Sequence, residues 1–397
     1  MSSRRRFLAA AAAASVGALA RLPRLRAAEY DLLVKGGRVI DPWRNVDRLA
    51  DVAVADGKIA AVRPNIPPSS AARVVDAENR LVVPGLIDIH THAVREKDGA
   101  ALCLADGVTS VVDAGSRGSD GIDAAVATAK AAPSRMRLLI NISRTGNDQQ
   151  NGELNDITKV DVEATRKAIE RHRDFVVGIK VRVSDFVAGK NDLQALKLAQ
   201  SVAGPLGVPI MVHMGQSVSP LPDLLAVLKP GDIVTHTYSP PPNGILDASG
   251  RLLPSVLDAR KRGVWFDVGN GLNKHITWDV AERATSAGFW PDTISTDWVP
   301  AGRTDQIFNL ATVLSKFLLL GMPLANVIAC ATANAARVMP AFKGFGTLAV
   351  GAFPDIAVME LQQGTFEFVD NDHAVRVGRQ RLVTRKVVFA GKSITEP

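Results

Sequence analysis

Two histidines at the end of one predicted strand are the first residues of the chain that could do chemistry. The stretch 83–92 reads Val-Pro-Gly-Leu-Ile-Asp-Ile-His-Thr-His. Pro84 and Gly85 mark its start, and the apolar run that follows is typical of a buried strand. Side chains alternate between the two faces of a strand, so His90 and His92 point the same way. A lone buried histidine is commonly a packing residue, whereas two on one face favour a shared metal ion.

Four more polar side chains end later apolar runs. The chain has 7 histidines, and His213 and His236 close two of these runs. Lys180 and Asp297 close two others. Polar residues gathered at the carboxyl ends of strands are typical of the catalytic face of a parallel barrel. The histidines that we expect to be solvated instead, in a helix and in loops, are His172, His275 and His373.

The runs that carry these residues number eight, and most are separated by helical periodicity. Strands alternating with helices over residues 85–342 predict an α/β fold, a (β/α)₈ TIM-type barrel. Beyond the first run, the predicted strands are 108–112, 137–141, 176–180, 209–213, 232–236, 264–268 and 293–297. The predicted helices include 121–132, 160–172, 193–203 and 305–320.

Both ends of the chain show short strands and turns instead. Residues 31–40 predict two strands around a Gly-Gly turn, and Asp56-Gly57 predicts a type I′ turn in the hairpin 50–62. The same pattern of short strands and turns occurs at 346–359 and 383–389. We therefore expect a small β-sandwich formed by both chain ends, residues 29–84 and 343–397, beside the barrel domain 85–342.

Residues 1–28 predict an export signal of the twin-arginine type. Arg4, Arg5 and Arg6 precede an alanine-rich run at 9–20 that is too short to anchor the chain across a bilayer. The string Ser-Arg-Arg-x-Phe-Leu resembles the twin-arginine signal. We expect a periplasmic or otherwise exported protein without stable membrane anchoring. A disordered or amphipathic tail is the alternative.

The charge of the chain excludes a nucleic-acid partner. The formal charge is +7, from 47 basic and 40 acidic residues. Six arginines precede the first acidic residue, Glu29, and without them 41 basic residues face 40 acidic ones. The body of the protein therefore has no basic excess to place against phosphates. Cys103 and Cys330 lie far apart in apolar stretches, which predicts buried thiols and no disulfide.

The ordered set of six strand-end residues resembles the amidohydrolase superfamily of binuclear metal hydrolases. Its hydantoinase- and dihydroorotase-like members also carry a β-sandwich built from both termini. The segments Gly178-Ile-Lys-Val-Arg182 and Thr235-His-Thr-Tyr238 are most similar to the deacetylase branch. Dihydroorotases have an arginine two residues after the second histidine; here that position is Val94, with Arg95 expected on the opposite strand face.

This resemblance implies two divalent metal ions. His90, His92 and Asp297 would hold one ion, and His213 and His236 the other. Lys180, carbamylated by CO₂, would bridge them, since an ammonium group cannot ligate a cation and a carbamate oxygen can. Mixed histidine and carboxylate ligands suit zinc best, with manganese or iron as alternatives.

The resemblance also suggests roles for individual side chains. Asp297 would move the proton from the attacking water to the leaving group. Arg182 shares a strand face with Lys180 and could clamp a substrate carboxylate. Tyr238 could bind the oxyanion or simply pack, and Asn270 could contact substrate or cap a loop.

Together these features predict a metal-dependent deacetylase acting on a small-molecule substrate. The substrate would be an acylated amino acid or 2-hydroxy acid, cleaved at an amide or ester bond. A cyclic amidase of the dihydroorotase or hydantoinase type is one alternative, and a non-catalytic binding barrel is another. A homo-oligomer is left open by the sequence.

Overall fold

The structure is a computed structural model that describes residues 28–148, 150–300 and 309–394. The predicted export signal, apart from its last residue, lies outside the described residues, as does the start of the helix predicted at 305–320. None of the described helices combines the length and the apolar character that crossing a membrane requires. Cys103 and Cys330 are both buried and free, as predicted.

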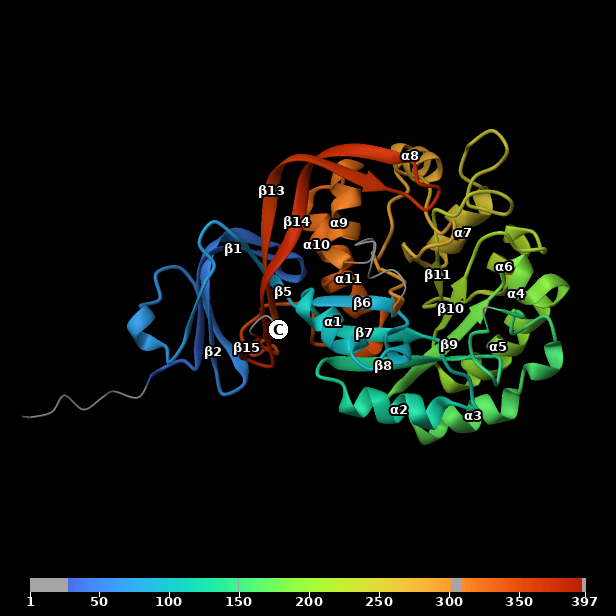
Figure 1. Ribbon diagram of the computed structural model, residues 1–397, viewed down its shortest axis with the longest axis horizontal. Helices are drawn as coiled ribbons and strands as arrows, with labels where there is room; N and C mark the ends of the chain where they lie inside the picture. The colour runs from blue at the N-terminus through green and yellow to red at the C-terminus, as the bar shows by residue number, and fades with distance from the viewer. Residues whose placement is uncertain (1–27, 149, 301–308, 395–397) are drawn as a thin grey trace, which may run out of the picture.

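Seven parallel strands form a curled sheet in chain order, each beside its sequence neighbour (Figure 1). All seven coincide with predicted apolar runs, and nearly all of their residues are buried. Burial on both faces is typical of a parallel sheet covered by helices. The strands are β6 (Leu86–Thr91), β7 (Val108–Ala114), β8 (Arg135–Asn141), β9 (Val176–Arg182), β10 (Ile210–His213), β11 (Ile233–Thr235) and β12 (Trp265–Phe266).

The eighth predicted strand, 293–297, is an irregular segment between the two edges of this sheet. It makes single parallel bridges, from Thr293 to Asp267 on one side and from Trp298 to Thr91 on the other. Asp297 has a φ of 53°, which interrupts the extended backbone and prevents a regular ladder. The α/β class and the parallel sheet are thus confirmed, while the eighth strand of the predicted barrel is not formed as a strand.

The predicted helices are present within a few residues of their expected ends. Helix α3, for example, begins where the Asp161 carboxylate accepts a hydrogen bond from the Ala164 amide at 2.8 Å. Helices α2 and α3 lie along the outer face of the sheet (Figure 1). The described helices are α1 (Gly99–Ala105), α2 (Ile122–Ala131), α3 (Val162–Arg171), α4 (Asp185–Ala188), α5 (Asp192–Leu206), α6 (Leu221–Val227), α7 (Pro254–Lys261), α8 (Trp278–Ser286), α9 (Leu310–Leu319), α10 (Leu324–Cys330) and α11 (Ala333–Val338).

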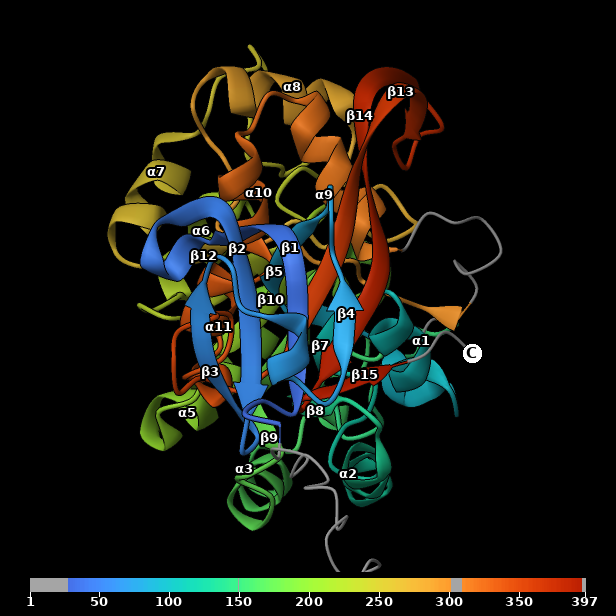
Figure 2. The ribbon, with the colours of Figure 1, turned by 90° about the vertical axis from the view of Figure 1, so that its left-hand side faces the viewer.

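A second sheet joins the two ends of the chain (Figure 2). Its strands run in the order β15-β14-β13-β5-β1-β2-β3, with β4 paired to β1. The sheet is continuous, so the two layers of the predicted sandwich are one mixed, largely antiparallel sheet; the exact domain boundaries stay a prediction. The strands are β1 (Leu32–Asp41), β2 (Val46–Ala55), β3 (Lys58–Arg63), β4 (Val74–Asp76), β5 (Leu81–Pro84), β13 (Ile356–Val369), β14 (Val375–Phe389) and β15 (Lys392–Ile394).

Two turn predictions for this sheet had different outcomes. Asp56 and Gly57 both have positive φ, 52° and 66°, as the predicted type I′ hairpin requires. The predicted turn at Gly36-Gly37 is instead a bulge within one strand, β1, where the register shifts between Val34 and Gly37. Gly36 absorbs the irregularity with a φ of 81°, so the chain continues in the same direction.

The hairpin β13–β14 is longer than its apolar pattern predicted, and it reaches the parallel sheet domain. Its far end lies beside α8 (Figure 1). There the Asp370 carboxylate accepts a hydrogen bond from the Trp278 amide at 2.8 Å, and the Ala374 carbonyl accepts one from the indole Nε1 at 2.9 Å. The C-terminal strands therefore support the loop that precedes α8.

Candidate metal centre

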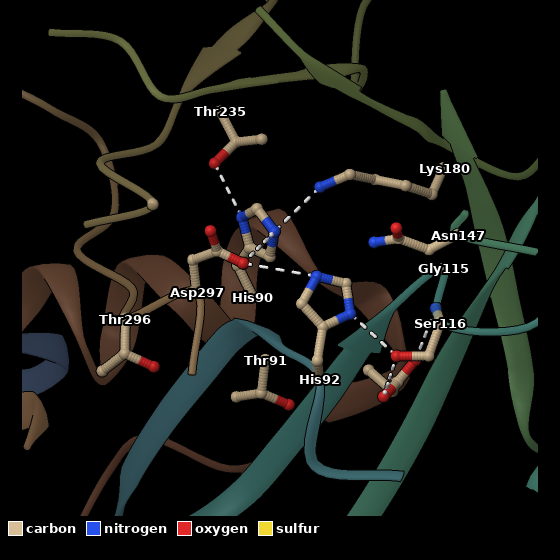
Figure 3. Close-up of polar contacts among 12 residues, drawn as sticks. His90, Thr91, His92, Gly115, Ser116, Asn147, Lys180, Thr235, Thr296 and Asp297 are labelled. Atoms are coloured by element: carbon tan, nitrogen blue, oxygen red, sulfur yellow. Dashed lines mark hydrogen bonds and ion pairs between the residues drawn. The ribbon is translucent and has the colours of Figure 1, made fainter. Parts of the chain in front are cut away.

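Six buried side chains converge at the carboxyl ends of the parallel strands. Figure 3 shows four of them, from β6, β9 and the irregular eighth segment, pointing toward one another. The carboxyl ends of parallel strands meet at one rim, which explains why residues so far apart in sequence come together. The six are His90, His92, Lys180, His213, His236 and Asp297, the set that the sequence singled out.

Asp297 lies at the middle of this group. Its Oδ1 is 3.2 Å from His90 Nε2 and 3.3 Å from His92 Nε2. Lys180 Nζ is 2.8 Å from the same His90 nitrogen. Ligand atoms of His90, His236 and Asp297 all lie within 4.8 Å of one another, a spacing that could hold a metal ion.

The tautomer of His90 follows from its outer hydrogen bonds. Thr235 Oγ1 donates its single hydrogen to Asp267 Oδ2 at 2.7 Å, so it must accept from His90 Nδ1 at 2.8 Å. The proton of the His90 ring is therefore on Nδ1. The Nε2 lone pair faces Asp297 and the centre of the site, as in metal-ligating histidines backed by a carboxylate.

Two further rings are oriented in the same way. Ser116 Oγ donates to Asp113 Oδ2 at 2.9 Å and accepts from His92 Nδ1 at 2.7 Å (Figure 3). His236 Nδ1 donates to the Gly269 carbonyl at 2.7 Å. Both rings therefore carry a proton on Nδ1 and direct Nε2 inward.

One of these inward nitrogens tests whether a cation fits. His236 Nε2 is buried and has no hydrogen-bond partner in the described part of the chain. Buried polar atoms are normally paired, and an orphan calls for a ligand. Unprotonated imidazole nitrogens beside a carboxylate are a donor set that divalent transition metals accept. The residues present therefore fit a metal ion.

Electrostatics keeps these groups in their ligating forms. Burial holds the pKa of His90, His213 and His236 well below the usual 6.5, so the rings are neutral. Burial alone would raise the pKa of Asp297, but the neighbouring His90, His275 and His92 rings outweigh it. The pKa of Asp297 is therefore well below its ordinary value, and the carboxylate is charged.

Lys180 is a buried amine without a hydrogen-bonded carboxylate in the described chain. Its Nζ contacts His90 Nε2 and, at 3.6 Å, Met211 Sδ. Burial lowers the pKa of Lys180 to about 7, opposed by the charge of Asp297. A substantial share of the lysine is therefore a neutral amine at neutral pH. Gly115 makes room for it, because a Cβ there would lie 2.5 Å from the Lys180 Cβ.

Two of the six residues have unusual backbone conformations. His236 has a φ of 64° and Asp297 a φ of 53°, both in the left-handed region that non-glycine residues rarely adopt. Such conformations cost on the order of 1–3 kcal/mol and persist where the surroundings impose them. Their occurrence at two adjacent site residues indicates a position under functional constraint.

A pocket of about 450 Å³ is lined by His92, Lys180, His213 and Asp297, and Arg182 lies in its wall. The guanidinium Nε is 3.2 Å from Glu153 Oε1, and Nη1 donates to Asn147 Oδ1 at 2.6 Å. Arg182 Nη2 is buried and without a partner among the described residues. Arg182 Nε also makes no hydrogen bond among these residues, although it lies close to the Glu153 carboxylate, so the guanidinium is only partly satisfied by the protein.

Arg95 also lines this pocket, which corrects its predicted position on the opposite strand face. The alternation of a strand does not reach it, because β6 ends at Thr91 and Ala93–Arg95 form a 3₁₀ turn. The exposed Arg95 side chain lies near Asn147, whose carbonyl oxygen is 3.5 Å from Nη2. Two arginines therefore face the same opening.

Tyr238 and Asn270 are not among the residues that line this pocket, which favours the packing and loop alternatives that the sequence left open over contact with a substrate. The Tyr238 hydroxyl donates to the Phe289 carbonyl at 3.2 Å, and its ring packs against Phe317. Asn270 is fully buried and accepts a hydrogen bond from Lys316 Nζ at 2.7 Å. The first is a packing tyrosine and the second supports a loop.

His275 is a site residue that the sequence analysis missed. It was expected to be solvated, yet its ring stacks on His236 with centroids 3.7 Å apart, and it lines the pocket. It follows the Gly269-Asn270-Gly271 loop at the end of the seventh strand, and that position was the available signal. The other two predictions hold better: His172 pairs with the exposed Asp123, and His373 is exposed in the β13–β14 turn.

Known proteins resemble this chain over nearly its whole length. A deacetylase of Enterococcus faecalis is 31% identical over 373 residues, which cover 92% of this chain and 99% of the relative. The crystal structure of an adenine deaminase matches with a TM-score of 0.84 at 31% identity, covering 92% of this chain and 99% of that one. A dihydroorotase structure matches with a TM-score of 0.81 at 27% identity, covering 91% and 97%. No protein-family model matches the sequence.

Proposed function

We propose a deacetylase function for this chain, which belongs to the amidohydrolase superfamily as a relative of its deacetylases. In this function it removes a small acyl group from an acylated amino acid or 2-hydroxy acid. The chain is a hydrolase of this superfamily, and its histidine clusters could hold metal ions. The observation that carries the substrate proposal is the free Nη2 of Arg182 beside the buried centre. It offers a carboxylate of the substrate a charged donor next to the reacting bond.

Two sets of residues would hold divalent cations. His90, His92 and Asp297 form one set, and His213 and His236 belong to the other, with zinc the best match to these donors. Cations bound there would polarise the acyl carbonyl and lower the pKa of a bound water.

The environment of Lys180 supports its carbamylation as a bridge between the two sets. A neutral amine nitrogen attacks CO₂ and loses a proton to solvent, which leaves an anionic carbamate. Burial supplies the neutral amine by lowering the pKa of Lys180 to about 7. Carbon-13 NMR of protein equilibrated with labelled bicarbonate should resolve one carbamate signal that is lost in Lys180→Ala. An active enzyme without that signal would refute the bridge.

The remaining steps belong to side chains of the pocket. Asp297 is ionised at neutral pH, so it can accept a proton from the attacking water and return it to the leaving nitrogen or oxygen. Arg182 would orient the substrate through its carboxylate. Its own position is fixed by Glu153 and Asn147, so little ordering is left for the moment of binding.

A cyclic amidase of the dihydroorotase or hydantoinase type is the second candidate. The position of Arg95 in the pocket favours it, as does the likeness to a dihydroorotase structure. Because another similar structure is that of an adenine deaminase, adenine should be included among the assayed compounds. A non-catalytic binding barrel is disfavoured, because all six predicted ligands converge in one buried centre.

Several further features are proposals that the sequence motivates. We propose export to the periplasm through the twin-arginine signal, with no stable membrane anchoring and no nucleic-acid partner; Arg4→Lys with Arg5→Lys should then leave the precursor in the cytoplasm. The segment 293–298 would complete an eight-membered barrel, because it bridges both edges of the seven-stranded sheet. Self-association is an open proposal that light scattering would decide.

The experiment is a comparison of substrate classes with matched arginine variants. Metal-loaded protein is assayed against N-acetyl amino acids, O-acetyl 2-hydroxy acids, cyclic ureides and adenine. A charged hydrogen bond contributes about 1.5–3 kcal/mol, so Arg182→Met should lower kcat/KM for acylated acids by roughly 10- to 150-fold. Neutral aryl acetates should change little, because they have no carboxylate.

Glu153 requires a second variant. Arg182→Met leaves this buried carboxylate unpaired and could destabilise the fold, whereas Arg182→Lys keeps the charge and loses the planar fork. Arg182→Lys should therefore fold and still discriminate poorly between acylated acids and neutral aryl acetates. Equal losses on acylated acids and aryl acetates would refute the carboxylate assignment. Turnover of cyclic ureides alone, lost in Arg95→Met, would establish the second candidate instead.

A further inference from the structure

A third histidine lies against the His213–His236 pair. His275 is in the loop between β12 and α8, and its ring stacks on His236 at an interplanar angle of 30°. It meets His213 edge-on, with ring centroids 4.9 Å apart. One ligand atom from each of the three rings lies within 4.8 Å of the others, so the three could hold one ion together.

The ring nitrogens of this cluster lack partners. His275 Nδ1 is buried and without a hydrogen bond in the described chain, although it lies 3.1 Å from Asp297 Oδ2. His236 Nε2 is also unpartnered and buried. Leaving two buried nitrogens unpaired costs about 1–3 kcal/mol each. A cation between the rings would satisfy both, and hydrogen bonding inside the protein does not.

The backbone at Gly271 makes the approach of His275 feasible. Gly271 has a φ of 51°, and a Cβ added there would lie 1.8 Å from His275 Nδ1 and 2.6 Å from Asp297 Oδ2. Any side chain at this position would occupy the space of the imidazole. The glycine therefore leaves a cradle that the ring fills, beside the carboxylate of the neighbouring set.

The β13–β14 turn holds the loop in place. Asn371 Oδ1 accepts hydrogen bonds from the amides of His275 and Ile276 at 2.8 and 3.0 Å. Asn371 Nδ2 donates to the Gly271 carbonyl at 2.9 Å. Three bonds from one side chain fix both ends of the segment that carries His275. The ring is preorganised by a distant part of the chain rather than placed by chance.

We propose that His275 is a third histidine ligand of the cation held by His213 and His236. The inference rests on the proposed function, because it adds a ligand to one of its two cation sites. The site then has three imidazole ligands beside the carbamate proposed on Lys180, and imidazoles favour zinc, cobalt, nickel or copper over magnesium and calcium.

The test measures metal affinity directly. Apo protein is titrated with Zn²⁺ and with Co²⁺ against a chromophoric chelator, for the full-length wild type, His275→Ala and His275→Asn. Loss of an outer-shell partner alone weakens metal binding 10- to 100-fold, so loss of a ligand should weaken one of two sites by about 100-fold or more. The visible absorption of the Co²⁺ protein should change with it.

Controls separate a metal ligand from a structural residue. His172→Asn removes a histidine that pairs with Asp123 on the surface, and it should bind both ions as the wild type does. In excess chelator, His275→Asn should unfold at no lower a temperature than the wild type, because it loses an unpaired buried nitrogen, so that a destabilisation of the variant appears only with metal. Both sites at wild-type affinity in His275→Asn would overturn the inference and leave the proposed function intact. A wild type that binds no ion would overturn the proposed function itself.

Discussion

The two halves of the metal centre are built on different principles. His90 and His92 end a regular strand, and their outer nitrogens lead through Thr235 and Ser116 to buried aspartates. In the other half His213 ends strand β10, but His236 and His275 lie on turns. The His236 ring donates to the Gly269 carbonyl, and the backbone amide of His275 donates to the Asn371 side chain. The first half is fixed by side chains of neighbouring strands, and the second depends largely on loops.

This difference indicates which half of the metal centre is rigid and which half can change. The strand half is locked by the register of a buried parallel sheet, which cannot shift by one residue without reversing every side chain. The loop half depends on left-handed residues and on a hairpin turn about a hundred positions downstream in the sequence. Changes to the hairpin should therefore reach only one of the two cation sites.

The largest expected effect comes from the residue that both halves share. Asp297 contacts His90 and His92 through one oxygen and His275 through the other. Asp297→Asn keeps the size of the side chain and removes its basicity, so turnover should fall by roughly 10²–10⁴. Steady-state kinetics on the best acylated substrate measures this, with metal content determined in parallel.

A surface pair supplies the control for that variant. Asp123 also faces a histidine, His172, but on the exposed side of α2. Asp123→Asn should leave kcat unchanged. Because the pKa of Asp297 is held well below its usual value, wild-type activity should persist as the pH falls toward 5. Full turnover in Asp297→Asn would remove the proton-transfer role, whatever happens to the metals.

The same contrast explains which parts of the site could be predicted. Alternation along a strand placed His90, His92 and Lys180 correctly, because those positions lie inside or directly after regular strands. Alternation does not extend beyond the end of β11, because the chain turns at His236, whose φ is 64°, and Tyr238 then packs against Phe317 of α9. The predicted strand face of Arg95 was wrong for the same reason, because the chain forms a 3₁₀ turn after β6.

The direction of the His275 side chain could not be predicted from a local pattern, although its position after the seventh strand was a signal. Its position depends on hydrogen bonds to Asn371, a residue 96 positions away, and on the absence of a side chain at Gly271. Loops carry no periodicity that reports which way a side chain faces. The sheet of the two chain ends was predictable as a union of strands, since turn chemistry marks its hairpins, but its continuity was not.

An intermediate effect should come from the relay behind His90. Thr235→Val removes the hydroxyl that joins His90 Nδ1 to Asp267. The His90 ring is then less firmly oriented and less basic. The affinity of the His90–His92–Asp297 site for a metal ion should therefore fall about 10- to 100-fold. The same chelator titration should find the other site unchanged.

A buried threonine elsewhere controls for the loss of a hydroxyl as such. Thr285 in α8 is buried, and its hydroxyl donates to the Ala281 carbonyl of its own helix. Thr285→Val should leave both affinities as in the wild type. If Thr235→Val weakened the two sites equally, the two halves would be one coupled unit, and the comparison drawn above would fail.

A buried lysine lies beneath the loop half of the centre. Lys316 in α9 is buried, and its Nζ donates to Asn270 Oδ1 at 2.7 Å beneath the loop. Burial lowers the pKa of Lys316 to about 8, opposed by the charge of Asp370. An unfolded lysine has a pKa of about 10.4. Between these two values the unfolded chain binds a proton that the folded protein has released.

The smallest expected effect follows from that difference in proton binding. A lowered folded pKa of a base costs stability fully below about pH 8, and the cost disappears as the pH rises toward about 10.4. Lys316→Met removes the charge but also the bond to Asn270, worth about 1 kcal/mol. Near pH 7 the apo variant should therefore be more stable than the wild type by on the order of 1–2 kcal/mol, and the gain should vanish near pH 10.

Urea unfolding of wild type, Lys316→Met and the exposed control Lys197→Met across this pH range measures the difference in the free energy of unfolding. A difference between wild type and Lys316→Met that stays constant from pH 7 to 10 would mean that folding does not lower the pKa of Lys316. The burial of this lysine would then have no proton-linked cost in stability.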